Sequence, residues 1–377
     1  MGSGIAQVAA VAGHPVILQD IDETAVARAR VGIDKALARE TEKGRLTASA
    51  AEAARGRVRY VAGSDLAPFA PCDLVIEAIV ERLGPKRESF AALENVVAAD
   101  AILASNTSAL SITAIAGGCR RPERVVGLHF FNPAPVMPLV EVVRGHATSG
   151  TLVVAAGDLV KRWGKTAVVT ADTPGFIVNR VARPFYGEAL RILDEGIADC
   201  ATIDWSMRAL GGFKMGPFEL MDLIGNDVNF AVTSAIFEAF FFDPRYKPSL
   251  TQRRLVDANL LGRKTGRGYY DYRDGAARPP AREDEALGRS MVNRIVTMLI
   301  NEAVDAVFWN VATPADLDVA MVKGVNYPKG LIAWAEEIGY QTVLQQLESL
   351  QAEYAEDRYR PSPLLRRLAT SGGTLLA

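Results

Sequence analysis

Ser105-Asn106-Thr107-Ser108 and His129-Phe130-Phe131-Asn132-Pro133 each follow an apolar run of β type. Polar residues that end apolar strands are typical of an open α/β sheet, because such a sheet binds ligands outside the carboxyl ends of its strands. On either side of these stretches, similar runs alternate with helical segments and predict strands at 16–19, 58–61, 73–79, 101–104, 125–129, 138–143 and 166–170. This alternation predicts a Rossmann-type α/β domain over residues 1–172.

The beginning of the chain carries only part of a dinucleotide-binding turn. A Rossmann unit opens with a strand and Gly-x-Gly-x-x-Gly, and an acid about 20 residues later binds the adenosine ribose and repels a 2′-phosphate. Asp20 is that acid, but only the last glycine, Gly2, is present, at the start of a helix predicted over 2–12. We therefore expect the first strand to be missing, with Met1 an internal methionine of a longer protein rather than a real truncation. As printed, the chain is expected to fold poorly and to hold pyrophosphate badly.

The composition argues against several classes of protein. Lys plus Arg number 42 against 44 Asp plus Glu, and a net charge of −2 predicts no nucleic-acid partner. The cysteines, Cys72, Cys119 and Cys200, are scattered without Cys-x-x-Cys spacing, which is typical of a reducing cytosol and argues against a disulfide framework or a zinc site. No apolar run reaches the ~18 residues of a membrane-spanning helix. We expect a cytoplasmic protein that binds no metal and no membrane.

His129 is the strongest candidate for a general base. The chain has three histidines, of which His14 lies in a turn and His146 in a polar loop. A histidine at the end of an apolar run is more often a satisfied core residue than a catalyst. Glu141 changes that balance, because it interrupts an apolar strand where a carboxylate is costly to bury unless it is paired. An imidazole held by a carboxylate is an oriented general base, so the two residues explain each other.

The second half of the chain contains an internal repeat. Val178-Asn179-Arg180 recurs 114 residues later as Val292-Asn293-Arg294. The same offset, without gaps, pairs Glu188 with Glu302, Asp204 with Asp318, Met207 with Met321, Gly216 with Gly330 and Gly225 with Gly339. Such a repeat predicts a duplicated domain, here all-α. We expect helical domains at 173–273 and 289–377, joined by a linker at 274–288.

Four stretches, 105–108, 127–133, 140–143 and 172–180, together resemble the motifs of the 3-hydroxyacyl-CoA dehydrogenase family. The resemblance covers nearly the whole chain apart from its extreme start. The segment 354–364 is similar to the tails of tandem-domain bacterial members, which include hydroxybutyryl-CoA and hydroxyadipyl-CoA dehydrogenases. The resemblance implies NAD-dependent oxidation of an L-3-hydroxyacyl-CoA to the 3-oxoacyl-CoA, in the β-oxidation of fatty acids or a phenylacetate-type catabolic route.

The resemblance implies a catalytic set of Ser108, His129, Glu141 and Asn179. His129 takes the hydroxyl proton while hydride leaves the same carbon, and Glu141 stabilises the imidazolium. Ser108 and Asn179 hydrogen-bond the developing carbonyl oxygen or the neighbouring thioester. On the sequence alone, Ser108 could instead be a helix N-cap, and Asn179 a cap or an interdomain hydrogen bond. We expect the set to lie in a cleft between the sheet and the first helical copy.

The resemblance also implies which residues bind NAD. The matching positions are Gly2, Asp20, Glu81, Lys86, Asn132 and Lys264. Three of them have other interpretations, since Glu81 could be a helix-start acid, Lys86 a solvated lysine and Lys264 part of a flexible surface turn.

The acyl-CoA side is matched less completely. Lys43 corresponds to a family lysine that meets the CoA phosphates, but the serine partner expected seven residues earlier is Ala36 here, which leaves one phosphate contact in doubt. The resemblance also implies that Ser108 contacts the acyl-CoA substrate. Ser105 and Asn106 either line the nicotinamide pocket or satisfy loop backbone.

Two other functions compete with the dehydrogenase. One keeps the fold but oxidises a sugar acid such as gulonate, and the duplicated helical domain and Lys43 argue against it. The other is a catalytically silent structural protein, suggested by the incomplete nucleotide turn, although the catalytic set is intact. Single-copy relatives dimerise through the helical domain, so the tandem copies leave the oligomeric state open, a homodimer included. Acyl-chain length and any preference for a terminal carboxylate do not follow from the sequence.

Overall fold

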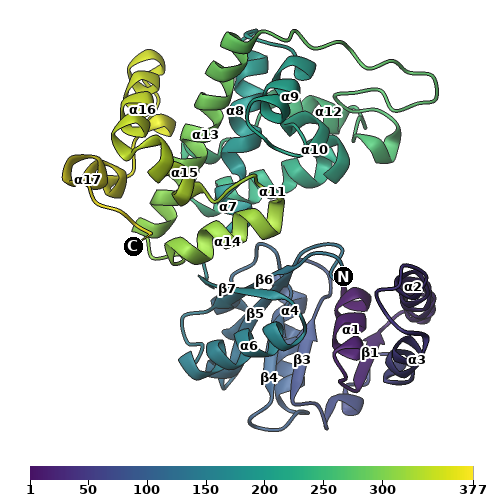
Figure 1. The fold of residues 1–377 in the computed structure, drawn as a ribbon. Helices are drawn as coiled ribbons and strands as arrows, with labels where there is room; N and C mark the ends of the chain where they lie inside the picture. The colour runs from purple at the N-terminus through teal and green to yellow at the C-terminus, as the bar shows by residue number, and fades with distance from the viewer. Residues whose placement is uncertain (377) are drawn as a thin grey trace. The chain divides into compact units, whose positions relative to one another are not determined.

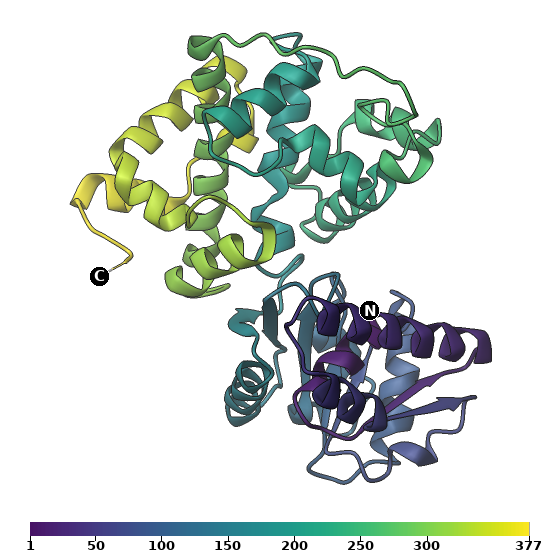
Figure 2. The same cartoon turned by 45° about the vertical axis from the view of Figure 1, so that its right-hand side comes forward.

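The computed structural model describes residues 1–376 (Figure 1; Figure 2). The chain divides into two compact units, Met1–Asp172 and Thr173–Ala377, and each is described by itself. The first is a Rossmann-type α/β unit and the second is helical, as the sequence predicts. The separation of two copies within the second unit, at 273 and 289, stays a prediction.

The first unit alternates strands and helices along most of its length. Its strands are β1 (Val16–Asp20), β2 (Val58–Ala62), β3 (Leu74–Glu77), β4 (Ile102–Ser105), β5 (Val125–Phe130), β6 (Leu139–Arg144) and β7 (Thr166–Ala171). Its helices are α1 (Gly2–Val11), α2 (Glu23–Glu42), α3 (Ala48–Gly56), α4 (Leu83–Glu94), α5 (Ile112–Ala116) and α6 (Gly150–Arg162), with 3₁₀ turns η1 (Ala67–Phe69) and η2 (Pro122–Arg124). Every strand expected from the sequence is present, although β3 ends at Glu77 rather than at residue 79.

These strands form two separate sheets. β1 pairs with β2 in parallel, and the other sheet has the order β3-β4-β5-β6-β7. Neighbours in the larger sheet are parallel except β5 and β6, which are antiparallel. The connection 131–138 is too short for the crossover that a parallel pair needs, so β6 returns alongside β5.

Helix α1 packs against both sheets (Figure 1). Ile5 belongs to the core cluster of the larger sheet, together with Phe130 and Val140. Ala6 and Ala10 belong instead to the cluster that includes residues of α2, α3 and β2. One short helix of mainly small side chains therefore holds the two sheets in one unit.

Within residues 1–376, no strand lies between β1 and β3. β1 pairs with β2 alone, and β3 pairs with β4 alone. In the usual doubly wound order the first strand lies between these two, and that is the strand which the sequence analysis expects to be missing. The apolar side chains of β1 are accordingly only half-buried, whereas every residue of β5 is buried. The unit thus has two sheet edges where one continuous sheet is expected.

The second unit is built from helices and short turns. Its helices are α7 (Val178–Val181), α8 (Arg183–Asp194), α9 (Cys200–Ala209), α10 (Pro217–Ile224), α11 (Asn226–Ala239), α12 (Leu250–Asp257), α13 (Glu285–Phe308), α14 (Pro314–Val325), α15 (Leu331–Ile338), α16 (Tyr340–Tyr354) and α17 (Pro363–Ser371), with 3₁₀ turns η3 (Pro244–Tyr246), η4 (Arg263–Thr265) and η5 (Asp357–Tyr359). α13 begins inside the predicted linker 274–288, because Asp284 caps it by accepting a hydrogen bond from the amide of Leu287 at 3.0 Å. In the described part of the chain, no helix has the length and apolarity that crossing a membrane requires.

The repeat is visible in matching hydrogen bonds. Asp204 accepts from two successive amides at the start of α10, at 2.9 Å each, and Asp318 does the same at the start of α15, at 2.7 and 2.9 Å. A Cβ at Gly216 would lie 2.2 Å from an atom of Asp204, and one at Gly330 would lie 2.2 Å from an atom of Asp318. In each copy the aspartate therefore lies so close to the backbone that only glycine fits at this position.

Two buried ion pairs link the copies reciprocally. Arg180 pairs with Glu302 at 2.6 Å, and Arg294 pairs with Glu188 at 3.0 Å. The two arginines stand 114 residues apart, as do the two glutamates. Such an exchange of partners is the signature of a two-fold interface. The repeat therefore makes within one chain a contact like that of a symmetric dimer.

Arg180→Met is expected to lower the free energy of unfolding by about 3–5 kcal/mol, because it takes the nearest cation from a buried carboxylate. Arg180 and Glu302 have side chains that are only 2% exposed. Arg253→Met, which breaks an exposed pair with Asp257, is the matched control and should cost less than about 1 kcal/mol. Urea unfolding followed by circular dichroism measures both losses. Equal losses would mean that the buried pair contributes no more than a surface pair.

Candidate active site

His129 and Glu141 meet across the antiparallel strands β5 and β6. The register places them opposite each other, and side chains of directly opposite residues on one face are close enough to touch. Nδ1 of His129 lies 2.6 Å from Oε2 of Glu141, whose side chain is 0% exposed. The ring of Phe131 packs on the imidazole with centroids 4.5 Å apart. The contact expected from the sequence is therefore formed.

This geometry suits a general base. An ionised carboxylate accepts hydrogen bonds but donates none, so with Glu141 ionised Nδ1 of His129 would be the donor in this contact and Nε2 of the neutral ring the acceptor. Glu141 is shielded from water, and its negative charge stabilises a positive imidazolium beside it. The pair can therefore take a proton from a hydroxyl group held at Nε2.

Ser108 lies in the loop after β4, and the carboxylate of Glu81 accepts several hydrogen bonds from this loop. Oε1 of Glu81 accepts from the amide of Ser108 at 2.8 Å, from its hydroxyl at 3.2 Å and from the hydroxyl of Thr107 at 2.6 Å. The N-cap of α5 is Ser111, whose hydroxyl accepts a hydrogen bond from the backbone amide of Ala114. The interpretation of Ser108 as a helix cap is therefore wrong. Burial raises the pKa of Glu81, but these hydrogen bonds and the charge of Lys86 outweigh it and hold that pKa below its usual value.

Lys86 is buried rather than solvated, so that interpretation of it is also wrong. Its side chain is 1% exposed, and Nζ lies 2.7 Å from Glu77 and 3.2 Å from Glu81. Glu81 precedes α4, but Arg82 occupies the N-cap position and no side chain caps that helix. The carboxylate of Glu81 serves the Ser108 loop instead of the helix start.

Ser105 and Asn106 tie the ends of three strands together. The hydroxyl of Ser105 donates to the carboxylate of Glu77 at 2.7 Å, and Oδ1 of Asn106 accepts from the amide of Phe130 at 2.9 Å. Ser105 also accepts from the loop amide of Thr107 at 3.2 Å, as the loop-backbone alternative expects, whereas Asn106 accepts from a strand amide. The links fix the carboxyl ends of β3, β4 and β5 beside one another.

Lys165 holds the loop that carries Asn132 through hydrogen bonds to the loop backbone. Asn132 is exposed and precedes Pro133 through a cis peptide bond. Nζ of Lys165 donates to the carbonyl oxygens of Ala134 at 2.6 Å and Met137 at 2.8 Å. Lys165 was missed in the sequence, because a lysine beside a turn glycine forms no recognisable pattern.

Of the six residues assigned to the dinucleotide, Asp20 and Gly2 have the chemistry that such a ligand needs. Asp20 ends β1 with its side chain exposed. α1 begins at Gly2, no side chain caps it, and its first turn holds no acid. Backbone amides at a helix start bind phosphate groups, and an acid at a strand end binds a ribose. A Cβ at Gly2 would lie 3.7 Å from that of Ala78, an ordinary contact, whereas one at Gly4 would lie 3.1 Å from Pro135.

The remaining predicted residues lie on helix ends and turns. Asn179 is in α7 and Lys264 in η4, both in the second unit. Nζ of Lys264 pairs with Asp227 at 2.5 Å. Lys43 is the exposed C-cap of α2 in the first unit. In the first unit, the described contacts join His129 to Glu141 and join Ser108, through Glu81, to Lys86.

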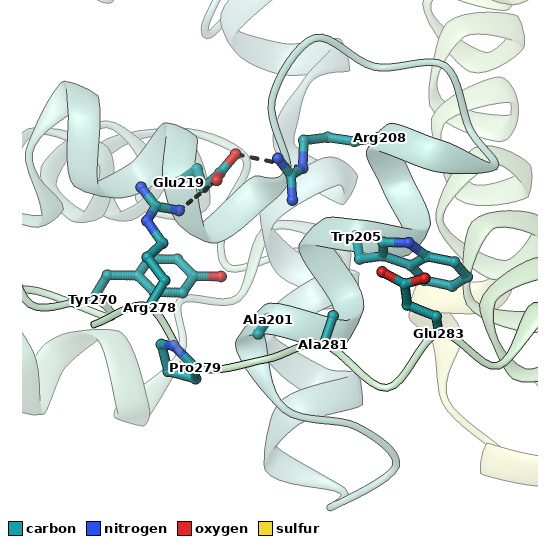
Figure 3. A pocket seen from close by; sticks show the side chains of 9 residues that line it. All are labelled: Ala201, Trp205, Arg208, Glu219, Tyr270, Arg278, Pro279, Ala281 and Glu283. Atoms are coloured by element: carbon teal, nitrogen blue, oxygen red, sulfur yellow. Dashed lines mark hydrogen bonds and ion pairs between the residues drawn. The ribbon is translucent and has the colours of Figure 1, made fainter.

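A cavity of about 380 Å³ lies in the second unit, and its described lining contains none of the predicted site residues (Figure 3). Trp205 and Tyr270 line it, together with Arg208 and Arg278. Both arginines face Glu219, at 3.7 and 2.5 Å, and Glu283 also lines the cavity, so its two positive and two negative side chains balance in charge. Among residues 1–376, no cluster of His, Cys, Asp and Glu is arranged to hold a metal ion.

Comparison with known proteins gives a consistent result over nearly the whole chain. Residues 1–173 match the family model for the NAD-binding domain of 3-hydroxyacyl-CoA dehydrogenase, and residues 175–272 and 291–374 match the model for its C-terminal domain. The chain is 41% identical to 3-hydroxyadipyl-CoA dehydrogenase of Escherichia coli K12, over 98% of this chain and 95% of that one. It is 42% identical to 3-hydroxybutyryl-CoA dehydrogenase of Bradyrhizobium diazoefficiens, over 75% and 95%. The crystal structure of 3-hydroxybutyryl-CoA dehydrogenase from Escherichia coli K12 superposes with a TM-score of 0.93 at 40% identity, covering 98% of this chain and 96% of that one.

Proposed function

The chain belongs to the 3-hydroxyacyl-CoA dehydrogenase family, and we propose which of its residues carry out the family reaction. The reaction is the NAD-dependent oxidation of a 3-hydroxyacyl-CoA to the 3-oxoacyl-CoA. The contact of 2.6 Å between His129 and Glu141 carries the proposal, because a hydroxyl can be oxidised only if its proton has an acceptor.

In this mechanism His129 takes the proton of the 3-hydroxyl group at Nε2, and Glu141 stabilises the imidazolium that forms. Bound NAD supplies the hydride acceptor. The buried carboxylate fixes the ring and its tautomer before substrate binds, so the base needs no reorganisation. In the reverse direction the same imidazolium returns the proton to the carbonyl oxygen.

Ser108 and Asn179 are proposed to stabilise the substrate oxygens. Charge shifts toward the 3-oxygen as the hydroxyl proton leaves, and hydrogen-bond donors at that oxygen lower the barrier. Glu81 holds the backbone amide of Ser108 at 2.8 Å. The hydroxyl of Ser108, which donates to Glu81 at 3.2 Å, would rotate to donate its one proton to the substrate oxygen instead. Asn179 is proposed for the same task from the start of the second unit.

The sugar-acid alternative is not favoured, because the similar proteins are named for CoA thioester substrates. The intact pair of His129 and Glu141 argues against a silent structural protein. We also propose that the two helical copies supply, within one chain, the contact that a homodimer of single-copy chains would make.

An activity assay with acetoacetyl-CoA and NADH distinguishes the dehydrogenase from the two alternative functions. A dehydrogenase of this family oxidises NADH when acetoacetyl-CoA is added and does so far more slowly with free acetoacetate. A sugar-acid enzyme would instead reduce NAD with gulonate. Absence of turnover with both substrates, in protein that is folded and binds NADH, would support the silent structural alternative.

Asp20→Ala is expected to weaken the preference for NAD over NADP by about 10–100-fold in kcat/KM. The carboxylate would bind the ribose hydroxyls and repel a 2′-phosphate, and a hydrogen bond to a charged group contributes about 1.5–3 kcal/mol. Glu23→Ala, an exposed acid in the first turn of α2, is the control and should leave the ratio unchanged. An unchanged ratio in Asp20→Ala would remove Asp20 from the cofactor site.

A further inference from the structure

Glu77, at the end of β3, is a buried carboxylate with three hydrogen bonds. Its side chain is 2% exposed and accepts from Nζ of Lys86 at 2.7 Å, from the hydroxyl of Ser105 at 2.7 Å and from the amide of Ile79 at 2.6 Å. A carboxylate without water needs such partners, because burial of an unpaired charge is costly. None of the roles assigned so far uses this residue.

Lys86 connects Glu77 to a second carboxylate, that of Glu81. It stands between Glu77, at 2.7 Å, and Glu81, at 3.2 Å. The side chain of Glu81 is 40% exposed, so the buried acid anchors the lysine and the lysine anchors the outer acid. One ammonium group therefore sets the position of the carboxylate that carries the Ser108 loop.

A second route leads from Glu77 to the same loop. The hydroxyl of Ser105 donates to Glu77 and accepts from the amide of Thr107 at 3.2 Å. Thr107 in turn donates to Glu81, whose Oε1 also accepts from the amide of Ser108. Two hydrogen-bonded routes thus converge on residues 107 and 108 from one buried acid.

We propose that Glu77 is a positioning residue for Ser108, acting through Lys86 and Glu81 on one side and through Ser105 on the other. The proposal deepens the proposed function and rests on it, since Ser108 is there assigned to the substrate oxygen. A neutral side chain at position 77 leaves Lys86 with Glu81 as its single carboxylate. Glu81 then turns toward the lysine and away from the amide of Ser108.

Hydrogen exchange tests the positioning without requiring activity. In Glu77→Gln the amide of Ser108 is expected to exchange about tenfold faster or more than in the parent chain. Glu94→Gln is the matched control, because Glu94 is also buried and accepts two backbone amides but has no described contact with residues 105–109. Unchanged exchange at Ser108 in Glu77→Gln, or an equal increase in both variants, would overturn the proposal.

Kinetics supply the second readout. Glu77→Gln should lower kcat for 3-hydroxyacyl-CoA oxidation about tenfold while Glu94→Gln leaves it unchanged, and Glu77→Asp, which keeps the charge, should recover part of the loss. If Glu77→Gln does not fold, Ser105→Ala replaces it and should speed exchange at the amide of Thr107; no increase would refute the second route and with it the proposal. A parent chain without dehydrogenase activity would refute the proposed function, whereas an active parent with unaffected variants would refute the role of Glu77 alone.

Discussion

His129→Gln is expected to lower kcat for 3-hydroxyacyl-CoA oxidation by about 10²–10⁴-fold, the range that a positioned general base contributes. Gln is preferred to Ala because its amide can still donate to Glu141, which is 0% exposed and would otherwise be buried without a donor at that place. KM for the acyl-CoA should change much less than kcat, because the proton transfer belongs to the transition state. Stopped-flow measurement of NADH formation gives both constants.

His146→Gln is the matched control for that result. His146 is exposed, and its described hydrogen bond comes from its backbone amide to the hydroxyl of Thr113. The substitution should leave kcat within about twofold of the parent. A loss of less than tenfold in His129→Gln, with the fold intact by circular dichroism, would mean that another group accepts the proton.

A strand added between β1 and β3 is expected to raise the free energy of unfolding by about 5 kcal/mol or more. The two open edges of the sheets would gain ladder hydrogen bonds of about 1 kcal/mol each, and each newly buried apolar side chain adds about 1.5–3 kcal/mol. The extension would consist of roughly 20 residues fused ahead of Met1, with an apolar strand followed by Gly-x-Gly before the start of α1.

The same extension should tighten NAD binding by about 100-fold or more, because the glycine turn adds backbone amides beside those at the start of α1, and each hydrogen bond to a charged phosphate contributes about 1.5–3 kcal/mol. Isothermal titration calorimetry measures the affinity and urea unfolding the stability. An extension with two prolines in the strand is the control, since proline cannot donate to a sheet ladder. Equal effects of the two extensions would show that no strand is taken up between β1 and β3.

The contact between His129 and Glu141 was predictable because Glu141 breaks a pattern. Glu141 stands in an otherwise apolar strand, and only a buried partner explains a carboxylate there. The break between β1 and β3 was predictable for a similar reason, since the topology needs a strand that residues 1–15 do not supply. In both cases a local sequence feature conflicts with a general rule of folding.

Contacts between distant segments were not predictable in the same way. Glu77 lies inside the strand predicted at 73–79 and Lys86 in the helix that follows it, and nothing in the sequence indicates that their side chains meet. The offset of the repeat shows that Arg180 corresponds to Arg294, but not that each guanidinium reaches the carboxylate of the other copy. Such partners depend on packing, which periodicity does not describe.

A double-mutant cycle on His129 and Glu141 tests most directly whether the two residues act as one general base. The measured quantity is kcat for acetoacetyl-CoA reduction in His129→Gln, Glu141→Gln and the double variant. If Glu141 acts only through the imidazole, the double variant is as slow as His129→Gln alone. Losses that multiply would show that Glu141 serves the reaction, or the fold, independently of His129.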